Sequence, residues 1–157
     1  MPSLIPNSEF VARRTEFLQQ MESNSVAVFC AAKELTRSRD TEFPFRQNSD
    51  FQYLTGFPEP DAWLILEKTD KGCESTLVCR VKDKTAEIWH GRRIGKDTAK
   101  QQFEFDCTRD ETELHKTLFD AVNNKQTLYW AQGESLDADE RVFALLSELR
   151  TGPKKGW

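Results

Sequence analysis

The chain has 157 residues, a net charge of −4, a charged fraction of 31% and a hydrophobic fraction of 38%. This length suits one domain with a core of its own, and the composition is that of a soluble globular protein. No basic stretch dominates and no apolar run approaches the roughly 20 residues of a membrane span, so neither nucleic acid nor a membrane is expected as a partner.

The first half of the chain predicts a helix followed by strands. Ser8 is placed to cap a helix whose apolar residues follow helical spacing. The apolar face of this helix consists of Phe10, Phe17, Leu18 and Met21. The nearly continuous apolar run at 25–32 predicts a strand that is buried on both faces. Further strands are expected at 62–68 and 75–81, and the short link at 69–72 predicts that they form a hairpin.

The second half predicts two helix–strand pairs and a final helix. We expect a short helix at 96–103 and a short strand at 104–108. Asp110 and Glu113 have the spacing of a capping box, with Asp110 as the cap residue. The helix behind this box carries Leu114, Leu118 and Val122 on one face.

A strand at 126–132 and a helix at about 136–150 complete the predicted elements. The apolar face of the last helix consists of Val142, Leu146 and Leu149, beside Phe143. Because helix and strand signals alternate along the chain, we expect an α/β fold with a mixed β-sheet flanked by α-helices.

The cysteines give no sign of a disulfide framework or a zinc site. They are Cys30, Cys73, Cys79 and Cys107, and none forms a C-x-x-C pair. The two histidines, His90 and His115, lie far from them in the sequence. A zinc site takes about four ligands, usually in close pairs. We therefore predict four free thiols, as in a reducing compartment, and a cytoplasmic protein with no secretory signal in MPSLIPNSEF.

Recognisable catalytic chemistry is missing from the sequence. A catalytic triad would have to use His90 or His115, and His115 is expected on the solvent face of its helix. Neither a P-loop nor a GxGxxG motif occurs. The predicted strands carry almost none of the carboxylates that a two-metal site needs. We therefore predict that this chain alone is inactive, with no catalytic residue, no metal and no other cofactor.

The segment TRSRDTEFPFRQNSDFQYLTGFPEP at 36–60 is unusual, because a polar run directly precedes an aromatic cluster. In one interpretation Ser49 or Asp50 caps a short helical turn. The core would then take up Phe51, Tyr53, Leu54 and Phe57. In another interpretation the polar run is a hydrogen-bonded bracket that fixes the preceding loop. The bracket residues would be Arg46, Gln47 and Asn48, followed by Asp50. Direct contact of this segment with a ligand is a further alternative.

The segment AEIWHGRR at 86–93 allows two interpretations as well. Trp and Arg often dominate interface energetics, so Trp89 with Arg92 and Arg93 suits a surface anchor. Alternatively, Trp89 belongs to the core and the two arginines are solvated.

These stretches resemble the N-terminal domain of bacterial aminopeptidase P, an Xaa-Pro aminopeptidase. The likeness is carried by 36–66, 80–95 and YWAQGE at 129–134, and by EFVARRTEFLQQM near the N-terminus. A looser form of FRQNSDF and the following LTGF occurs in the wider family that includes prolidase and creatinase. Gln52 and His90 depart from the pattern, since close relatives carry an aromatic residue at the first position and usually Phe at the second.

The resemblance implies a division of labour between two domains. Residues 1–150 would be a non-catalytic domain of the creatinase/prolidase N-terminal type, which is ribonuclease-H-like. Residues 151–157 would begin a linker toward a C-terminal pita-bread domain, absent from this chain. That domain would hold two manganese ions (Mn2+) and remove the N-terminal residue ahead of a proline.

The resemblance also implies site residues and partners. Trp89 matches a tryptophan at the mouth of the family's active site, and Asp40 matches an acidic residue near the same mouth. With Arg37 they would wall the cleft of a neighbouring subunit, while Arg92 and Arg93 would serve the subunit interface. The implied partners are the protein's own catalytic domain, the other subunits of a homo-oligomer and a proline-containing peptide. A prolidase domain and a stand-alone binding module are the alternatives.

Overall fold

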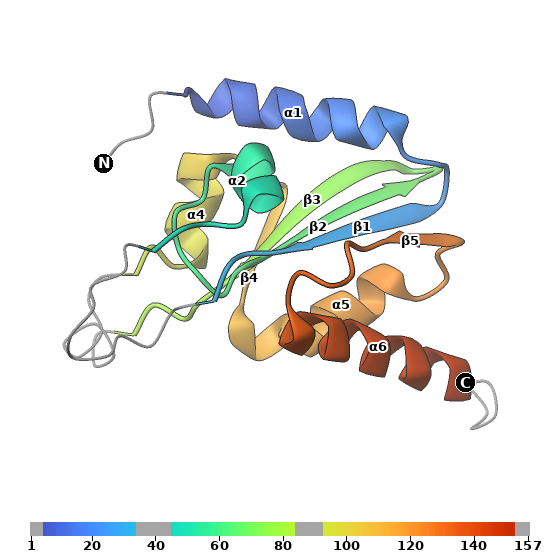
Figure 1. The fold of residues 1–157 in the computed structure, drawn as a ribbon. Helices are drawn as coiled ribbons and strands as arrows, with labels where there is room; N and C mark the ends of the chain where they lie inside the picture. Colours follow the sequence, from blue (N-terminus) through green and yellow to red (C-terminus); the bar gives the residue numbers. More distant parts are fainter. Residues whose placement is uncertain (1–4, 34–44, 84–92, 153–157) are drawn as a thin grey trace.

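The structure, a computed structural model, describes residues 5–33, 45–83 and 93–152 (Figure 1). Five strands form one mixed sheet in the order β4-β3-β2-β1-β5. The strands are β1 (Ser25–Cys30), β2 (Trp63–Thr69), β3 (Gly72–Cys79), β4 (Cys107–Asp110) and β5 (Thr127–Tyr129). The pairs β1–β2 and β2–β3 are antiparallel, whereas β1–β5 and β3–β4 are parallel. The predicted α/β class and mixed sheet are therefore confirmed.

Helices cover both faces of this sheet (Figure 1). One face is covered by α1 (Asn7–Gln20), α2 (Ser49–Thr55) and α4 (Lys96–Phe103). The other face is covered by α5 (Leu114–Val122), which follows the 3-10 helix η1 (Glu111–Glu113), and by α6 (Leu136–Thr151). Neighbouring residues of a strand point to opposite faces. Accordingly, Ala27 and Leu64 join the first core, and Val26 and Ile65 join the second.

Several predicted elements agree closely with the observed ones. The β2–β3 hairpin forms, α4 has the predicted bounds, and β1 is buried through its first four residues. The predicted apolar face of α5 is confirmed, since Leu114, Leu118 and Val122 are all buried. On α6, Val142 is buried and Leu146 and Leu149 are partly buried, but Phe143 is exposed. His115 is exposed as expected, and its Nε2 lies 3.1 Å from Glu148 Oε2.

Four details of the prediction are wrong. Ser8 does not cap α1, because the helix already begins at Asn7 behind Pro6 and has no side-chain cap. The strand expected at 104–108 is β4, which begins three residues later and ends two residues later. The strand expected at 126–132 pairs with β1 through three residues only. Asp110 does act as a cap, but its Oδ1 accepts from Thr112 N at 3.0 Å and thereby starts η1 instead of α5.

A buried arginine joins the three helices on the first face. Arg14 of α1 is 3% exposed. Its guanidinium donates to Leu54 O at 2.9 Å, Phe103 O at 3.1 Å and Glu104 O at 3.2 Å. Burial of the charge lowers the pKa of Arg14 to about 10. These bonds connect α1 to the ends of α2 and α4, where helix carbonyls otherwise lack partners.

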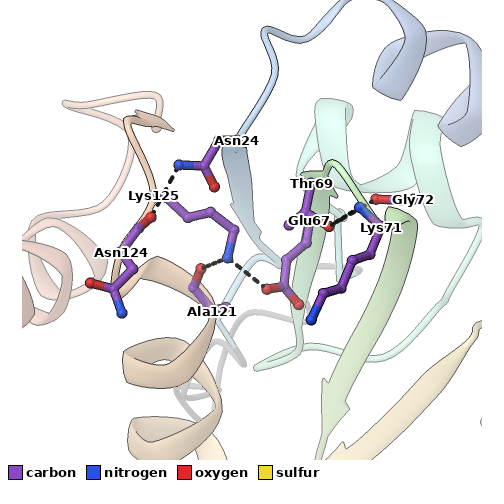
Figure 2. A network of polar contacts seen from close by, with 8 residues as sticks. All are labelled: Asn24, Glu67, Thr69, Lys71, Gly72, Ala121, Asn124 and Lys125. Carbon is purple, nitrogen blue, oxygen red and sulfur yellow. Dashed lines mark hydrogen bonds and ion pairs between the residues drawn. The ribbon is translucent and has the colours of Figure 1, made fainter.

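Polar contacts hold β5 at the sheet edge. Figure 2 shows Asn24 and Asn124 side by side, and Asn24 Nδ2 donates to Asn124 O at 3.1 Å. Both residues have positive φ, 53° and 65°, a conformation that asparagine tolerates better than most residues. Nearby, Lys125 Nζ donates to Ala121 O at 2.9 Å and to Glu67 Oε1 at 3.1 Å (Figure 2). The lysine thus links the end of α5 to the central strand β2.

This network leads to a prediction about stability. Only 9% of the Lys125 side chain is exposed, so Met should keep its packing while removing the charge. We expect Lys125→Met to lower the free energy of unfolding by about 1–2 kcal/mol, measured by urea denaturation. Lys116→Met, an exposed position on α5, is the control and should change it by less than about 0.5 kcal/mol. Equal losses in the two variants would contradict a stabilising role for the Lys125 contacts.

Candidate functional site

The predicted site residues divide into two groups. Arg37, Asp40, Trp89 and Arg92 lie outside the described residues. The structure does describe Arg46, Gln47, Asn48, Asp50 and Arg93. These residues, with the strand ends beside them, form the flanks of segments 34–44 and 84–92. The described part of the candidate site therefore consists of these flanks.

Gln47 is the most highly connected side chain of the polar run. Its Oε1 accepts from Ala32 N at 2.9 Å and from Asn48 N at 3.0 Å. Its Nε2 donates to Phe57 O at 3.1 Å and to Glu59 O at 2.9 Å. A side-chain amide has two donors and one oxygen with two lone pairs, so Gln47 uses its full capacity. It joins the chain after β1 to the chain after α2.

Asn48 is the cap of α2. Its Oδ1 accepts from Phe51 N at 3.0 Å, and its Nδ2 donates to Glu134 Oε2 at 3.0 Å. The alternative in which Ser49 or Asp50 caps the helix is therefore wrong, because both residues already lie within the first turn. Arg46 and Asp50 are exposed. The functional role of the predicted bracket stays a prediction.

The aromatic cluster behind this cap is buried except at one position. Phe51 and Phe57 are 0% exposed, and Leu54 is 3% exposed. Tyr53 is 55% exposed and lies against the Arg13 guanidinium, so its predicted place in the core is wrong. The helix ends at Gly56, which has a φ of 65°. A Cβ at Gly56 would lie 2.4 Å from Phe10 Cε2, so glycine allows α1 to approach closely.

A cavity of about 460 Å³ lies beside Gln47 and Asn48. It is bounded by 28–33 at the end of β1, by 46–50, and by residues between Trp130 and Ala138. Its lining carries both signs of charge, from Lys33, Arg46, Asp50 and Glu134. The cavity lies outside the carboxyl ends of the parallel strands β1 and β5, where open α/β sheets commonly place ligands.

One wall of this cavity is held by Trp130, which the sequence did not single out. Its ring stacks on Trp63 at a centroid distance of 5.8 Å, and its Nε1 donates to Asp139 Oδ1 at 2.9 Å. Asp139 also accepts from Gly133 N at 3.0 Å and is 7% exposed. An aromatic residue beside Ala131 in YWAQGE was the available signal. Its buried partner on α6 could not be read from the sequence.

Glu59 is a second functional candidate that the sequence did not single out. This glutamate is 8% exposed. Its Oε2 accepts from Ile94 N at 2.8 Å, and its Oε1 lies 3.7 Å from Arg80 Nη2. Nearby, Arg93 Nη1 donates to Val81 O at 3.2 Å, so the guanidinium of Arg93 is engaged within the domain. The signal in the sequence was a charged residue between two prolines, Pro58 and Pro60, which follow the buried Phe57.

These residues connect the flanks of the two segments to one another through hydrogen bonds. In the ranges 5–33, 45–83 and 93–152, no group of three or more His, Cys, Asp and Glu residues is placed to hold a metal ion. No helix in these ranges is both long and apolar enough to cross a membrane. All four cysteines are free thiols, as predicted.

Three of the four thiols have a raised pKa. Burial raises the pKa of Cys30 and of Cys79 to about 12. A hydrogen bond to Glu74 Oε1 at 2.9 Å is the main cause that raises the pKa of Cys107, followed by burial. Because the thiolate is the reactive form, a raised pKa suppresses reaction at neutral pH.

Comparison with known proteins agrees with this geometry. Residues 10–129 match the sequence model of the family described as aminopeptidase P, N-terminal domain. The chain belongs to this family, whose type of fold is the mixed sheet described above.

Among curated proteins, the chain is 44% identical to Xaa-Pro aminopeptidase of Escherichia coli K12 over 154 residues, which cover 98% of this chain and 35% of that protein. Its identity to Xaa-Pro aminopeptidase of Haemophilus influenzae is 38% over 125 residues, which cover 80% of this chain and 29% of that protein. The chain thus spans about a third of the length of these relatives.

Solved structures give the same relationship. The chain superposes on an E. coli aminopeptidase P variant in complex with substrate with a TM-score of 0.91 and 44% identity, covering 98% of this chain and 35% of that one. Zinc-substituted E. coli aminopeptidase P in complex with product gives a TM-score of 0.90 at the same identity and coverage.

The helix cap Asn48 and the side-chain amide of Gln47 can be tested separately. We expect Asn48→Ala to lower the free energy of unfolding by about 1 kcal/mol, because Phe51 N loses its acceptor. Asn48→Ser should keep most of the stability, because serine also caps helices well. Gln47→Leu removes four hydrogen bonds to backbone groups, and we expect a loss of about 3 kcal/mol. Urea denaturation measures both. A Gln47→Leu loss no larger than that of Asn48→Ala would contradict the central place of this amide.

The burial and hydrogen bonding of the cysteines lead to a prediction about their reactivity. In the native protein at pH 8, Cys73 should react first with a thiol reagent because it is exposed. Cys30 and Cys79 should react slowly, because pH 8 lies far below their pKa of about 12. Glu74→Gln removes the carboxylate that raises the pKa of Cys107 and should increase the rate at which this thiol reacts.

Mass spectrometry of the labelled peptides assigns each reaction to its cysteine. Glu134→Gln, remote from Cys107, is the control and should leave the Cys107 rate unchanged. An unchanged Cys107 rate in Glu74→Gln as well would show that this hydrogen bond does not govern the thiol.

Proposed function

We propose that this chain is the N-terminal domain of a manganese-dependent Xaa-Pro aminopeptidase, which removes the N-terminal residue that precedes proline. The observation that carries the proposal is 44% identity to the E. coli enzyme over 98% of this chain, with a TM-score of 0.91 to its structure. The domain would contribute subunit contacts in a homo-oligomer and one wall of a neighbouring subunit's substrate cleft. Four free thiols support a cytoplasmic location.

In this proposal the metal chemistry belongs to a separate catalytic domain. The described residues contain no ligand group that fits a metal ion, and the family match is to an N-terminal domain. When bound in the catalytic domain, the two ions would activate the water that attacks the peptide bond. This chain would supply binding surface and shape instead, and we assign it no step of the hydrolysis.

The proposed cleft wall uses residues in the two segments whose flanks form the candidate site. Trp89 would present an apolar face to the proline ring of a substrate. Asp40 and Arg37 would add charges that complement the peptide, because opposite charges across a cleft guide and orient a ligand. Arg92 and Arg93 would pair with acidic groups of another subunit, although Arg93 already donates to Val81 O.

Trp89 gives the decisive test. In the complete protein, Trp89→Ala should lower kcat/KM for Xaa-Pro peptides by about 10- to 100-fold, equivalent to roughly 1–3 kcal/mol, because an apolar contact with the substrate is lost. The melting temperature of the 157-residue chain should be nearly unchanged by the same substitution. Steady-state kinetics and calorimetry measure the two effects.

Two outcomes would count against the cleft wall. If Trp89 is a core residue, its replacement by Ala should cost roughly 3–5 kcal/mol of folding stability. If the folded variant cleaves Xaa-Pro peptides at the normal rate, Trp89 does not contact substrate. Tyr53→Ala, which removes an exposed aromatic on α2, is the matched control and should leave kcat/KM within about twofold.

A further inference from the structure

The flanks of segments 34–44 and 84–92 meet at one residue, Glu59. Its backbone carbonyl accepts from Gln47 Nε2 at 2.9 Å. The same amide accepts from Ala32 N at 2.9 Å, directly before the first segment. Gln47 therefore connects both sides of segment 34–44 to the backbone of Glu59.

The side chain of Glu59 contacts both flanks of the second segment, 84–92. Its Oε2 accepts from Ile94 N at 2.8 Å, on the C-terminal side of segment 84–92. Its Oε1 lies 3.7 Å from Arg80 Nη2, on the N-terminal side. The two carboxylate oxygens are thus divided between the two ends of one segment, while the carbonyl of the same residue serves the other segment.

Burial makes this carboxylate costly unless it is paired. The side chains of Glu59 and Arg80 are only 10% and 11% exposed. Taking such charges out of water has a large desolvation cost, which hydrogen bonds and a well-placed counter-charge must offset. A glutamine could also accept from Ile94 N, but more weakly, because a hydrogen bond to a charged acceptor is stronger than one to a neutral acceptor. It would offer Arg80 no charge, so the negative charge of Glu59 acts on both of its partners.

We propose that Glu59 is a positioning residue that holds the base of segment 84–92, through Arg80 and Ile94, in a fixed place relative to the base of segment 34–44, through Gln47. The consequence for catalysis rests on the proposed function: Trp89 and Asp40 would then face the substrate as one wall. Glu59 itself would touch neither substrate nor metal.

The structure offers a matched control for a purely structural ion pair. Glu67 on β2 pairs with Lys125 at 3.1 Å and is 24% exposed. It lies in the network at the start of β5 (Figure 2), among bonds to α5 and not to either segment flank. Glu67→Gln and Glu59→Gln make the same chemical change at two ion pairs. Of these two pairs, the Glu59–Arg80 pair lies at the flank of segment 84–92, and the Glu67–Lys125 pair does not.

The first experiment uses the 157-residue chain and amide hydrogen exchange followed by NMR. Glu59→Leu removes the acceptor of Ile94 N, so the Ile94 amide should exchange at least about tenfold faster, whereas Glu67→Gln should leave it unchanged. Should Glu59→Leu fail to fold, Glu59→Gln keeps the volume and an acceptor, and a two- to fivefold acceleration is expected as Arg80 loses its counter-charge. Unchanged Ile94 exchange in a folded variant would overturn the proposal.

The second experiment uses the complete protein and steady-state kinetics on an Xaa-Pro peptide. We expect the folded Glu59 variant to raise KM by about 5- to 20-fold with kcat within about twofold, because the wall binds substrate without taking part in the reaction. In the Trp89→Ala background the same change should have a clearly smaller effect, since Trp89 is one of the residues that Glu59 would position. Glu67→Gln should leave both constants unchanged.

The outcomes separate this inference from the proposed function. If Trp89→Ala raises KM and the Glu59 variant does not, the positioning role is wrong and the cleft wall stands. Fully additive effects of the two substitutions on KM would also overturn it, because Glu59 would then act independently of Trp89. If Ile94 exchange accelerates while Trp89→Ala leaves kcat/KM unchanged, the anchoring by Glu59 stands and the proposed cleft wall fails.

Discussion

Gln47 exchanges four hydrogen bonds with backbone groups at Ala32, Asn48, Phe57 and Glu59, and the candidate site depends on this one amide. Each of these groups would otherwise need water or another partner at a crowded sheet end. Since donors and acceptors of an amide are not interchangeable, only one arrangement of the chain satisfies them all. The apolar cores on the two faces stabilise the sheet, but this polar contact determines where the chain leaves it.

The same separation of roles recurs elsewhere in the domain. Arg14 connects three helices through carbonyl oxygens, and Lys125 connects α5 to β2. Buried polar groups are costly when unpaired, so each such contact favours a single packing of its elements. Hydrophobic burial alone tolerates small shifts between helices and sheet.

The sequence predicted the strands well where apolar residues run nearly without interruption, as in β1 and β2. It predicted the starts of α4 and α6 correctly. It did not predict the start of α2, because Asn48, Ser49 and Asp50 can all act as caps and only the backbone conformation selects Asn48. Helical geometry accounts for the error at Tyr53. That residue lies about 200° around the axis from Phe51, so the two cannot share a buried face. Gln47 was recognised as part of a bracket, whereas Glu59 was missed because its partners, Arg80 and Ile94, are distant in sequence.

The shortness of the outer strands has a consequence for how this domain behaves among other proteins. Within the described residues, the sheet ends in β4 with four residues and β5 with three, while the longer β1, β2 and β3 are internal. Long exposed strand edges invite pairing with other chains and aggregation, and short edges reduce that risk. The apolar sequences of the inner strands are thereby kept from intermolecular β-pairing. Side chains and loops, rather than unpaired strand backbone, therefore make up most of the surface that the described part of the domain exposes.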